Sequence, residues 1–422
     1  MLSRIAYKEL LFKPFQNLML IALIALAIAA SVFVVSLNQG LQKGLTIATE
    51  PFPQLIAAKG GSNQVVVNTV FLQDNPVGNV SAEVFQAVKN SPLVQQAVPL
   101  AFGDNYRGFK VVGASEEIFS FIHQRTNKPW LSIDKGRVFE KPFEVVVGHK
   151  AAKMAELNIG DTFRSVHGAS EHGMAHEELF TVVGIMKHIG GPYDQVIFSS
   201  IETVWMAHDH DAHDHEAEEE RASQAEDHEH HDHDEDEDHA HDHEGESEVT
   251  AIIVRPAGYG EAMRLAQEYQ GSHDAQLIFP AQAVVKLFSM MGQGQQLWTY
   301  LGGFLIAVAL LLVMVTLYLS GLNSLRERAI LLSMGASPRQ LLKLSLQQNA
   351  MIIATGGLIG YLLGYIVYAL LAGLINQRTA IELPISFMST PFLVALFTVV
   401  AGLLVSLIPA LLLRRKDVLR FL

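Results

Sequence analysis

A chain of 422 residues with no cysteine and a formal net charge of −13 is long enough for two or three domains. The absence of cysteine excludes disulfide staples and thiolate metal sites. The acidic balance comes from one stretch, residues 208–248, which holds 20 acidic residues and a single arginine, whereas the remainder of the chain is net basic. The overall charge therefore describes that stretch and says nothing about the fold.

Four long uncharged runs predict membrane-spanning helices. Each holds about 20 or more mostly apolar residues, enough for a helix to cross the hydrocarbon core. The runs are residues 14–42, 287–325, 344–377 and 383–413, in which we expect spans at 16–38, 297–322, 345–375 and 391–413. The first run is too long for the apolar part of a cleaved signal peptide and lacks its small-residue cleavage pattern, so we interpret it as a retained anchor.

Basic residues gather beside three of the expected membrane boundaries. They precede the first run, lie between the second and third runs, and follow the fourth run. The positive-inside rule therefore places both termini, the segment 323–344 and the tail 414–422 in the cytoplasm. The long segment 39–296 and the short loop 376–390 then lie outside.

Residues 1–15 have the pattern of a basic amphipathic helix lying on the inner membrane surface, where Pro14 would end it. Its apolar and basic positions are Leu2, Ile5, Leu10 and Leu11 against Arg4, Lys8 and Lys13. The alternative is ordinary charge flanking a membrane span.

The outer segment alternates short runs rich in valine and isoleucine with helical patterns. We expect strands at residues 64–71, 110–113, 144–148, 180–186, 195–198 and 249–254. We expect helices at residues 81–89, 149–157, 260–270 and 280–290. The predicted fold class is a membrane protein with four transmembrane α-helices and a large α+β extracytoplasmic domain, residues 39–296, inserted between spans 1 and 2.

The acidic stretch 208–248 is also rich in histidine. It has almost no apolar residues, so we expect a disordered loop. Its eleven histidines are His208, His210, His213, His215, His228, His230, His231, His233, His239, His241 and His243. Imidazole with neighbouring carboxylates favours zinc or another divalent metal. The alternative is a solubilising acidic linker.

A second group of histidines lies in the folded part of the outer segment. His167, His172 and His176 have two glutamates beside them, and three imidazoles with a carboxylate could hold zinc. His149 and His188 border the same predicted strands. The alternative is a solvent-exposed hairpin with scattered histidines.

The segment 323–344 predicts a helix, a tight turn and a short basic helix at the membrane face. Gly335 is placed to end the first helix, and Ser337-Pro338 has the pattern of an N-cap followed by proline at the first helical position. A plain cytoplasmic loop is the alternative. In the third run, Gly356, Gly360 and Gly364 recur every fourth residue, which predicts a face for close packing between membrane helices.

No catalytic motif is evident in the chain. It contains no Gly-Lys dipeptide, so it has no P-loop, and no nucleophile–base arrangement stands out. If transport is driven by ATP, the nucleotide must be used by a separate subunit.

The turn resembles the signature of the MacB/FtsX-like permeases, through Arg326, Glu327, Met334, Gly335, Ala336, Ser337 and Leu341. Short sequence motifs of the outer segment are similar to those of the MacB-like extracytoplasmic domain. They lie at residues 111–113, 144–148, 160–163 and 180–185. Val418 stands where the family has proline. The resemblance implies that the turn couples to a cytoplasmic ABC ATPase through Arg326, Glu327, Arg328, Met334, Gly335, Ala336, Ser337 and Pro338.

The leading hypothesis is thus the permease subunit of such a transporter in a bacterial inner membrane, working with an ABC ATPase and a second permease copy in a homodimer or a related heterodimer. Divalent metal handling, with a periplasmic metal-binding protein as partner, is a narrower hypothesis. The alternatives are a mechanotransmitting scaffold that regulates an envelope hydrolase, an export or lipoprotein-release permease with an incidental metal-binding loop, and a membrane-tethered metal buffer. No nucleic-acid partner is expected.

Overall fold

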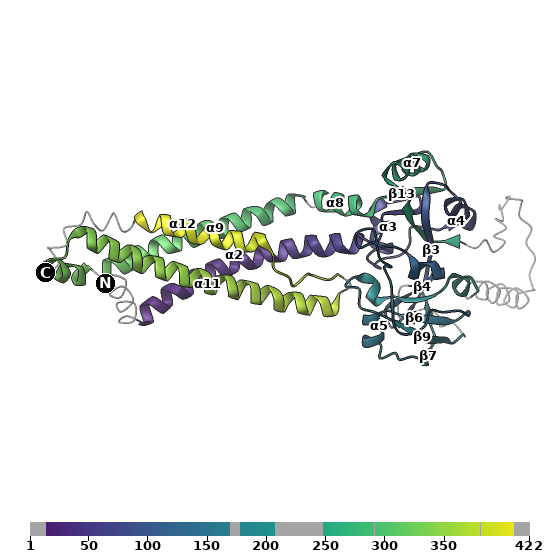
Figure 1. Cartoon of the computed structure of the whole chain (residues 1–422), viewed down its shortest axis with the longest axis horizontal. Coiled ribbons are helices and arrows are strands. Elements are labelled where there is room, and N and C mark those ends of the chain that lie inside the picture. Colours follow the sequence, from purple (N-terminus) through teal and green to yellow (C-terminus); the bar gives the residue numbers. More distant parts are fainter. Residues whose placement is uncertain are drawn as a thin grey trace, which may run out of the picture. The chain divides into compact units, whose positions relative to one another are not determined.

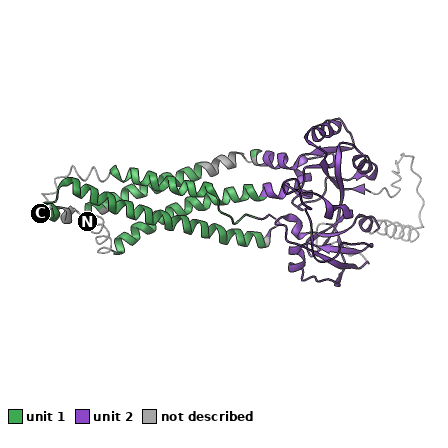
Figure 2. Ribbon diagram, in the orientation of Figure 1, with its two compact units in different colours: residues 1–44, 288–378, 383–422 green, residues 45–287, 379–382 purple. Residues whose placement is uncertain are grey.

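The computed structural model of the chain describes residues 14–168, 178–206, 248–290, 292–323, 325–379 and 381–408. Two compact units make up the chain (Figure 2). Unit 1 comprises Met1–Gly44, Phe288–Arg378 and Leu383–Leu422, and unit 2 comprises Leu45–Leu287 with Thr379–Glu382. The predicted surface helix 1–15 lies outside the described residues except for Pro14 and Phe15, and the tail 414–422 lies outside them entirely.

Unit 1 is built from helices. They are α2 (Pro14–Thr49), α9 (Gly292–Asn323), α10 (Leu325–Ser333), α11 (Pro338–Arg378) and α12 (Ser389–Val405). In the part of the chain that the structure describes, three helices are long and apolar enough to cross a membrane: Pro14–Thr49, Tyr300–Leu319 and Pro338–Gln377. The fourth expected span coincides with α12, an apolar helix of 17 residues. Its predicted range, 391–413, continues beyond the described residues.

Aliphatic side chains from α2, α9, α11 and α12 form the core of unit 1. The buried members are Leu20, Ile24, Ile28, Val32, Val313, Leu317, Ile352, Ile353 and Ala395. On the outside, α11 carries exposed apolar residues such as Leu358, Leu362, Ile366 and Leu370. An apolar surface on an apolar core is what lipid surroundings favour.

The three glycines of α11 lie against α2. A Cβ on Gly360 would come within 2.6 Å of the carbonyl oxygen of Ala25, and one on Gly364 would come equally close to that of Ala29. A Cβ on Gly356 would lie 2.8 Å from Cγ2 of Ile24. Because none of these positions has room for a methyl group, the spacing of four serves close helix packing.

Unit 2 is organised on one sheet of eleven strands (Figure 1). The order along its main path is β13-β1-β12-β3-β4-β10-β6-β9-β5, with β7 paired to β9 and β8 paired to β3. The strands are β1 (Gln54–Ala58), β3 (Val94–Tyr106), β4 (Phe109–Ala114), β5 (Ile133–Gly136), β6 (Glu144–Val147), β7 (Thr162–Phe163), β8 (Val166–His167), β9 (Phe180–Met186), β10 (Ile197–Ser200), β12 (Ala251–Pro256) and β13 (Ala275–Ile278). A separate pair joins β2 (Val80–Ser81) to β11 (Glu248–Val249). The β6–β9 and β4–β10 pairs are parallel, and the other pairs are antiparallel.

Helices and two hydrophobic clusters complete unit 2. The helices are α3 (Ser62–Thr69), α4 (Ala82–Lys89), η1 (Glu116–Ser120), α5 (His149–Met154), η2 (Pro192–Gln195), α7 (Tyr259–Gln270) and α8 (Pro280–Met290), the last of which runs into unit 1. One cluster contains Ile56, Phe85, Ile252 and Leu265, and the other contains Val145, Phe163, Phe180 and Ile197. Unit 2 thus has two hydrophobic cores on one continuous sheet.

One predicted strand is wrong. Residues 64–71 lie largely in helix α3, although β-branched residues favour strands. In the helix Val65, Val66, Asn68 and Thr69 are buried, so tertiary packing overrides the local preference. No strand was predicted at β1, β2, β3, β5, β7, β8 or β13. In contrast, the helices predicted at 81–89, 260–270 and 280–290 match α4, α7 and α8 to within one residue.

Candidate functional site

The turn between α10 and α11 closes both helix ends with its own hydrogen bonds. Gly335 has a φ of +95°, and its N–H donates to the carbonyl of Leu332 at 3.0 Å. The N–H of Ala336 donates to the carbonyl of Leu331, also at 3.0 Å. This pair of bonds around a left-handed residue is a Schellman motif, which glycine adopts without a Cβ penalty.

The next helix begins with a reciprocal capping box. The N–H of Ser337 donates to Oε1 of Gln340 at 2.8 Å, and the N–H of Gln340 donates to Oγ of Ser337 at 3.3 Å. Pro338 is the first residue of α11. The predicted helix end and N-cap are thus confirmed. The predicted short basic helix is wrong, because α11 continues without a break from Pro338 to Arg378.

Because the capping bonds use backbone N–H and C=O groups of the turn, its accessible surface consists largely of side chains. Met334 is 78% exposed, and Ser337 and Pro338 are exposed as well. Arg326, Glu327 and Arg328 lie on α10, but their side chains are outside what the structure describes. Because the backbone of the turn is already fixed, the entropic cost of ordering it when a partner binds would be small.

A polar cavity of about 710 Å³ lies in unit 2. Trp205 and Glu248, the residues near the two ends of that stretch, line it, and the indole N–H of Trp205 donates to the carbonyl of Glu248 at 2.8 Å. Lys110 also lines the cavity, and burial lowers the pKa of its ammonium, with Asp74 opposing the shift.

His167 lines the same cavity and faces a buried carboxylate. Its Nδ1 lies 3.6 Å from Oδ1 of Asp104, whose other oxygen accepts a hydrogen bond from Oγ of Ser165 at 3.1 Å. The companions that the sequence suggested for His167, namely His172 and His176, lie outside the described residues. The eleven histidines of 208–248 lie outside them too.

A second histidine–aspartate pair lies beside the carboxyl ends of two neighbouring strands of the sheet. His149 follows β6 and His188 follows β9, and because these strands are parallel neighbours their carboxyl ends lie side by side. β10 runs antiparallel to β6, so Asp194, which precedes it, reaches the same strand ends. The rings of His149 and His188 are 5.4 Å apart.

Asp194 holds His188 in a fixed orientation. The imidazole Nδ1 lies 2.8 Å from Oδ2 of Asp194, which is fully buried. The same carboxylate accepts backbone N–H bonds from Ile189, Gly190 and Gly191, at 3.0, 2.9 and 3.4 Å. The three backbone donors and the adjacent imidazole compensate the burial of the charge.

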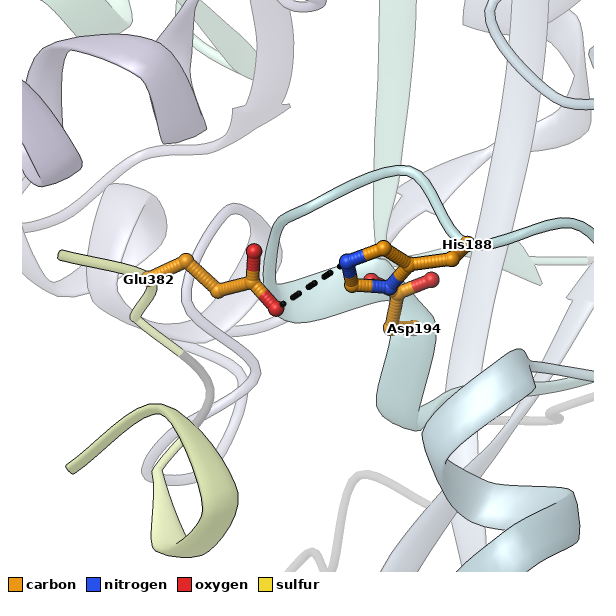
Figure 3. Close-up of side chains that lie close together, drawn as sticks. All are labelled: His188, Asp194 and Glu382. Carbon is orange, nitrogen blue, oxygen red and sulfur yellow. Dashed lines mark ion pairs between the residues drawn. The ribbon is translucent and has the colours of Figure 1, made fainter. Parts of the chain in front are cut away.

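Glu382 reaches this pair from the loop between α11 and α12 (Figure 3). Its Oε1 lies 3.6 Å from Nε2 of His188 and 2.6 Å from Nζ of Lys150. Its Oε2 passes so near Gly190 that a Cβ there would be 3.1 Å away. Within the described residues, His188, Asp194 and Glu382 are the group of three side chains whose ligand atoms lie within 4.8 Å of one another.

The sequence contained part of the signal for this cluster. His149 and His188 were seen to border the same strands, and the parallel pairing of β6 with β9 explains why they meet. Asp194 and Glu382 were missed. Asp194 looks like an ordinary turn residue after Pro192, and Glu382 is almost 190 residues away along the chain with no local pattern.

Two family models match the chain. One, described as MacB-like periplasmic core domain, matches residues 18–230, and the other, described as FtsX-like permease C-terminal, matches residues 300–418. Among curated proteins, no individual one matches significantly.

Solved structures that are similar to part of the chain include two transporter domains. The periplasmic region of MacB from Actinobacillus actinomycetemcomitans is 12% identical, with 57% of this chain and 94% of that chain covered and a TM-score of 0.33. The extracellular domain of the noncanonic ABC-type transporter YknZ from Gram-positive bacteria is 12% identical, with 53% and 98% covered and a TM-score of 0.28.

The family assignment rests on the two sequence models, which together extend from the first membrane helix to the C-terminal helices. With the first of them matching half of its length, the chain belongs to the MacB/FtsX-like family of ABC transporter permeases.

Proposed function

We propose that the chain is a permease subunit that couples a separate cytoplasmic ATPase to work done by its periplasmic domain. Permeases of this family work with a cytoplasmic ABC ATPase. The observation that carries the coupling role is the α10–α11 turn, whose two capping motifs fix its backbone and leave Met334 exposed.

Helix α11 extends from this turn as one element of 41 residues. A helix of that length is about 60 Å long. Its last residue, Arg378, is followed directly by Thr379–Glu382, which belong to unit 2. A push on the turn would therefore pass along one helix into residues of the outer unit, with no flexible joint inside α11.

The same features favour a mechanical mode of action. The core between α2, α9, α11 and α12 is aliphatic, and the α11 glycines lock that helix against α2. A tightly packed bundle moves as discrete packed elements rather than deforming continuously. These observations suit either transport of cargo held by the periplasmic domain or, as a second candidate, mechanical control of an envelope hydrolase.

Metal handling is the narrower part of the proposal. The stretch 208–248 carries eleven histidines among its acidic residues. Trp205 and Glu248, described residues near its two ends in the sequence, line the cavity together with His167 and Asp104. Imidazole and carboxylate groups suit zinc, so we propose that this stretch collects zinc ions at the periplasmic side.

The coupling proposal can be tested at the turn. Met334→Glu and Ala336→Glu should each reduce co-purification with the cognate ABC ATPase, and the stimulation of its ATP hydrolysis, by at least tenfold, because they place charge on the docking surface. Met154→Glu is the matched control, since Met154 is 54% exposed on α5 of the periplasmic domain. Normal ATPase binding and stimulation in both turn variants would exclude the turn as the contact.

A further inference from the structure

The cluster of His188, Asp194 and Glu382 has no part in the coupling role or in the histidine-rich stretch. His188 is half exposed, Glu382 is 20% exposed and Asp194 is fully buried. The connection from β9 to η2 and the distant loop that carries Glu382 thus bring a nitrogen ligand and two carboxylates together at the carboxyl ends of parallel strands.

The hydrogen bonds of Asp194 determine which imidazole nitrogen is available. An ionised carboxylate offers no proton, so the ion pair at 2.8 Å favours the form of His188 in which Nδ1 carries the proton. In the neutral ring Nε2 then holds a lone pair, and that lone pair faces Oε1 of Glu382. Two acceptors that face each other repel unless a positive charge lies between them.

The separation of these two atoms suits a bridging ion. At 3.6 Å, Nε2 and Oε1 are farther apart than the donor and acceptor of an ordinary hydrogen bond. Two ligands on a tetrahedral zinc ion, at the usual Zn–N and Zn–O distances, are about 3.3–3.5 Å apart. A shift of a few tenths of an ångström in Glu382 would meet that spacing.

We propose that Nε2 of His188 and the carboxylate of Glu382 bind a divalent cation, with zinc as the ion that this ligand set favours. Asp194 orients the imidazole, as carboxylates behind metal-binding histidines commonly do. His149, with its ring 5.4 Å from that of His188, offers a further imidazole, and water would complete the coordination.

Lys150 competes with the ion. Its side chain is only 14% exposed, and its Nζ lies 2.6 Å from the same Oε1 of Glu382. In the ion-free protein this lysine neutralises the glutamate, and an incoming cation must displace it from that oxygen. Zinc binding therefore replaces the ammonium of Lys150 with a metal ion at Oε1 of Glu382. Removal of the lysine should increase the affinity for zinc.

The location of Glu382 gives the site a consequence for the loop between α11 and α12. Thr379–Glu382 belong to unit 2, while Arg378 and Leu383 on either side belong to unit 1. An ion shared by His188 and Glu382 would fasten this short segment to the β9–η2 region. The inference concerns the folded periplasmic domain and is independent of ATPase coupling.

Hydrogen–deuterium exchange of the full-length protein in detergent, followed by mass spectrometry with and without Zn²⁺, separates this site from the histidine-rich stretch. Zinc should slow exchange in peptides covering residues 187–195 and 381–388. The backbone amides of Ile189, Gly190 and Gly191, which donate to Asp194, report on the site directly. Peptides from 208–248 report separately on the stretch.

Four variants define the ligands. Glu382→Gln and His188→Asn should abolish the zinc-dependent protection of 187–195 and 381–388, and Asp194→Asn should weaken zinc binding there by about 10- to 100-fold. Lys150→Met should lower the zinc concentration needed for half protection, a gain that misfolding cannot produce. Glu140→Gln, at a glutamate 68% exposed, is the matched control and should behave like the wild type.

Protection confined to peptides from 208–248 would overturn the inference and leave zinc collection by that stretch intact. Protection of 187–195 that survives both Glu382→Gln and His188→Asn would also overturn it. If zinc slowed exchange in neither region, the metal part of the proposed function would fail as well.

Discussion

Two histidines of the periplasmic domain face buried aspartates, yet their surroundings differ. His167 is 3.6 Å from Asp104, and His188 is 2.8 Å from Asp194. Both rings are about half exposed and both carboxylates are almost completely buried. Behind His188 the aspartate is fixed by three backbone donors, and in front of it stands a second carboxylate.

This comparison teaches that the number of histidines along the chain does not reveal which of their rings is oriented by neighbouring groups. The sequence drew attention to His167 because other histidines follow it closely. The structure gives His188 the two features that a ligand needs, which are an oriented ring and an anion opposite its available nitrogen. The second feature comes from a loop far away in the sequence.

The largest effect should come from removing the two aspartates. Asp194→Ala leaves three backbone donors and His188 without their acceptor in a buried place, and should cost about 3 kcal/mol or more of stability. Asp104→Ala removes an acceptor from Ser165 and should cost about 1–2 kcal/mol. Thermal melting of the purified protein, followed by tryptophan fluorescence, measures the difference. Equal losses would end the distinction between the two pairs.

Zinc binding should separate the two histidines. Calorimetric titration of His188→Gln should lack a binding event that the wild type shows, because the oriented ligand is gone. His167→Gln should keep that event. The reverse result would return the folded metal site to the position that the sequence suggested, and identical titrations for both variants would assign all binding to residues 208–248.

Deleting residues 209–246 and joining the ends by a short glycine–serine linker should change the melting temperature by only a few degrees. The ends are already held together by the bond from Trp205 to Glu248, and closure entropy depends only weakly on loop length. Most of the bound zinc should be lost, while the event that depends on His188 remains. Loss of the cooperative melting transition would show that the stretch contributes to folding.

The smallest expected effect on stability is that of replacing Glu144. Its carboxylate is paired with an arginine, and we compare it with the carboxylates of Asp104 and Asp194. The Arg137 guanidinium binds Glu144 through both oxygens and lowers the pKa of that carboxyl to about 2. A lowered pKa means that the pair stabilises the fold above the unfolded pKa and that this contribution is lost as pH falls toward 2. The melting temperature of Glu144→Gln should therefore lie slightly below that of the wild type at neutral pH. This difference in melting temperature should disappear between about pH 4.5 and 2. A gap that persists at pH 2 would refute this account.

The features that followed from the sequence are those with local causes. The α10–α11 turn was predicted because Gly335, Ser337 and Pro338 each determine the backbone at their own position. The α11 glycines were predicted because a spacing of four keeps them on one helix face. The strand expected at 64–71 failed because burial among neighbours, and not the valines themselves, decides that segment.

The His188 cluster could be predicted only in part, for a physical reason. His149 and His188 follow strands whose pairing is parallel, so their proximity depends on sheet order, which single-strand patterns do not contain. The position of Glu382 depends on how the loop between α11 and α12 packs against the β9–η2 connection within unit 2. Nothing in the residues near Glu382 encodes that contact.

The pairing of β1 with β13 has a mechanical consequence. Helix α2 leads into β1 and β13 leads into α8, and the two strands are antiparallel, with Leu55 opposite Ile278 where the chain enters and leaves the sheet. Hydrogen bonds in such a ladder lie across the strands. If α2 and α8 separated, the load would fall on one bond pair at a time and the sheet would unzip from this corner. If α2 and α8 moved together, no force would act across the β1–β13 hydrogen bonds. The whole sheet would then move as a rigid body.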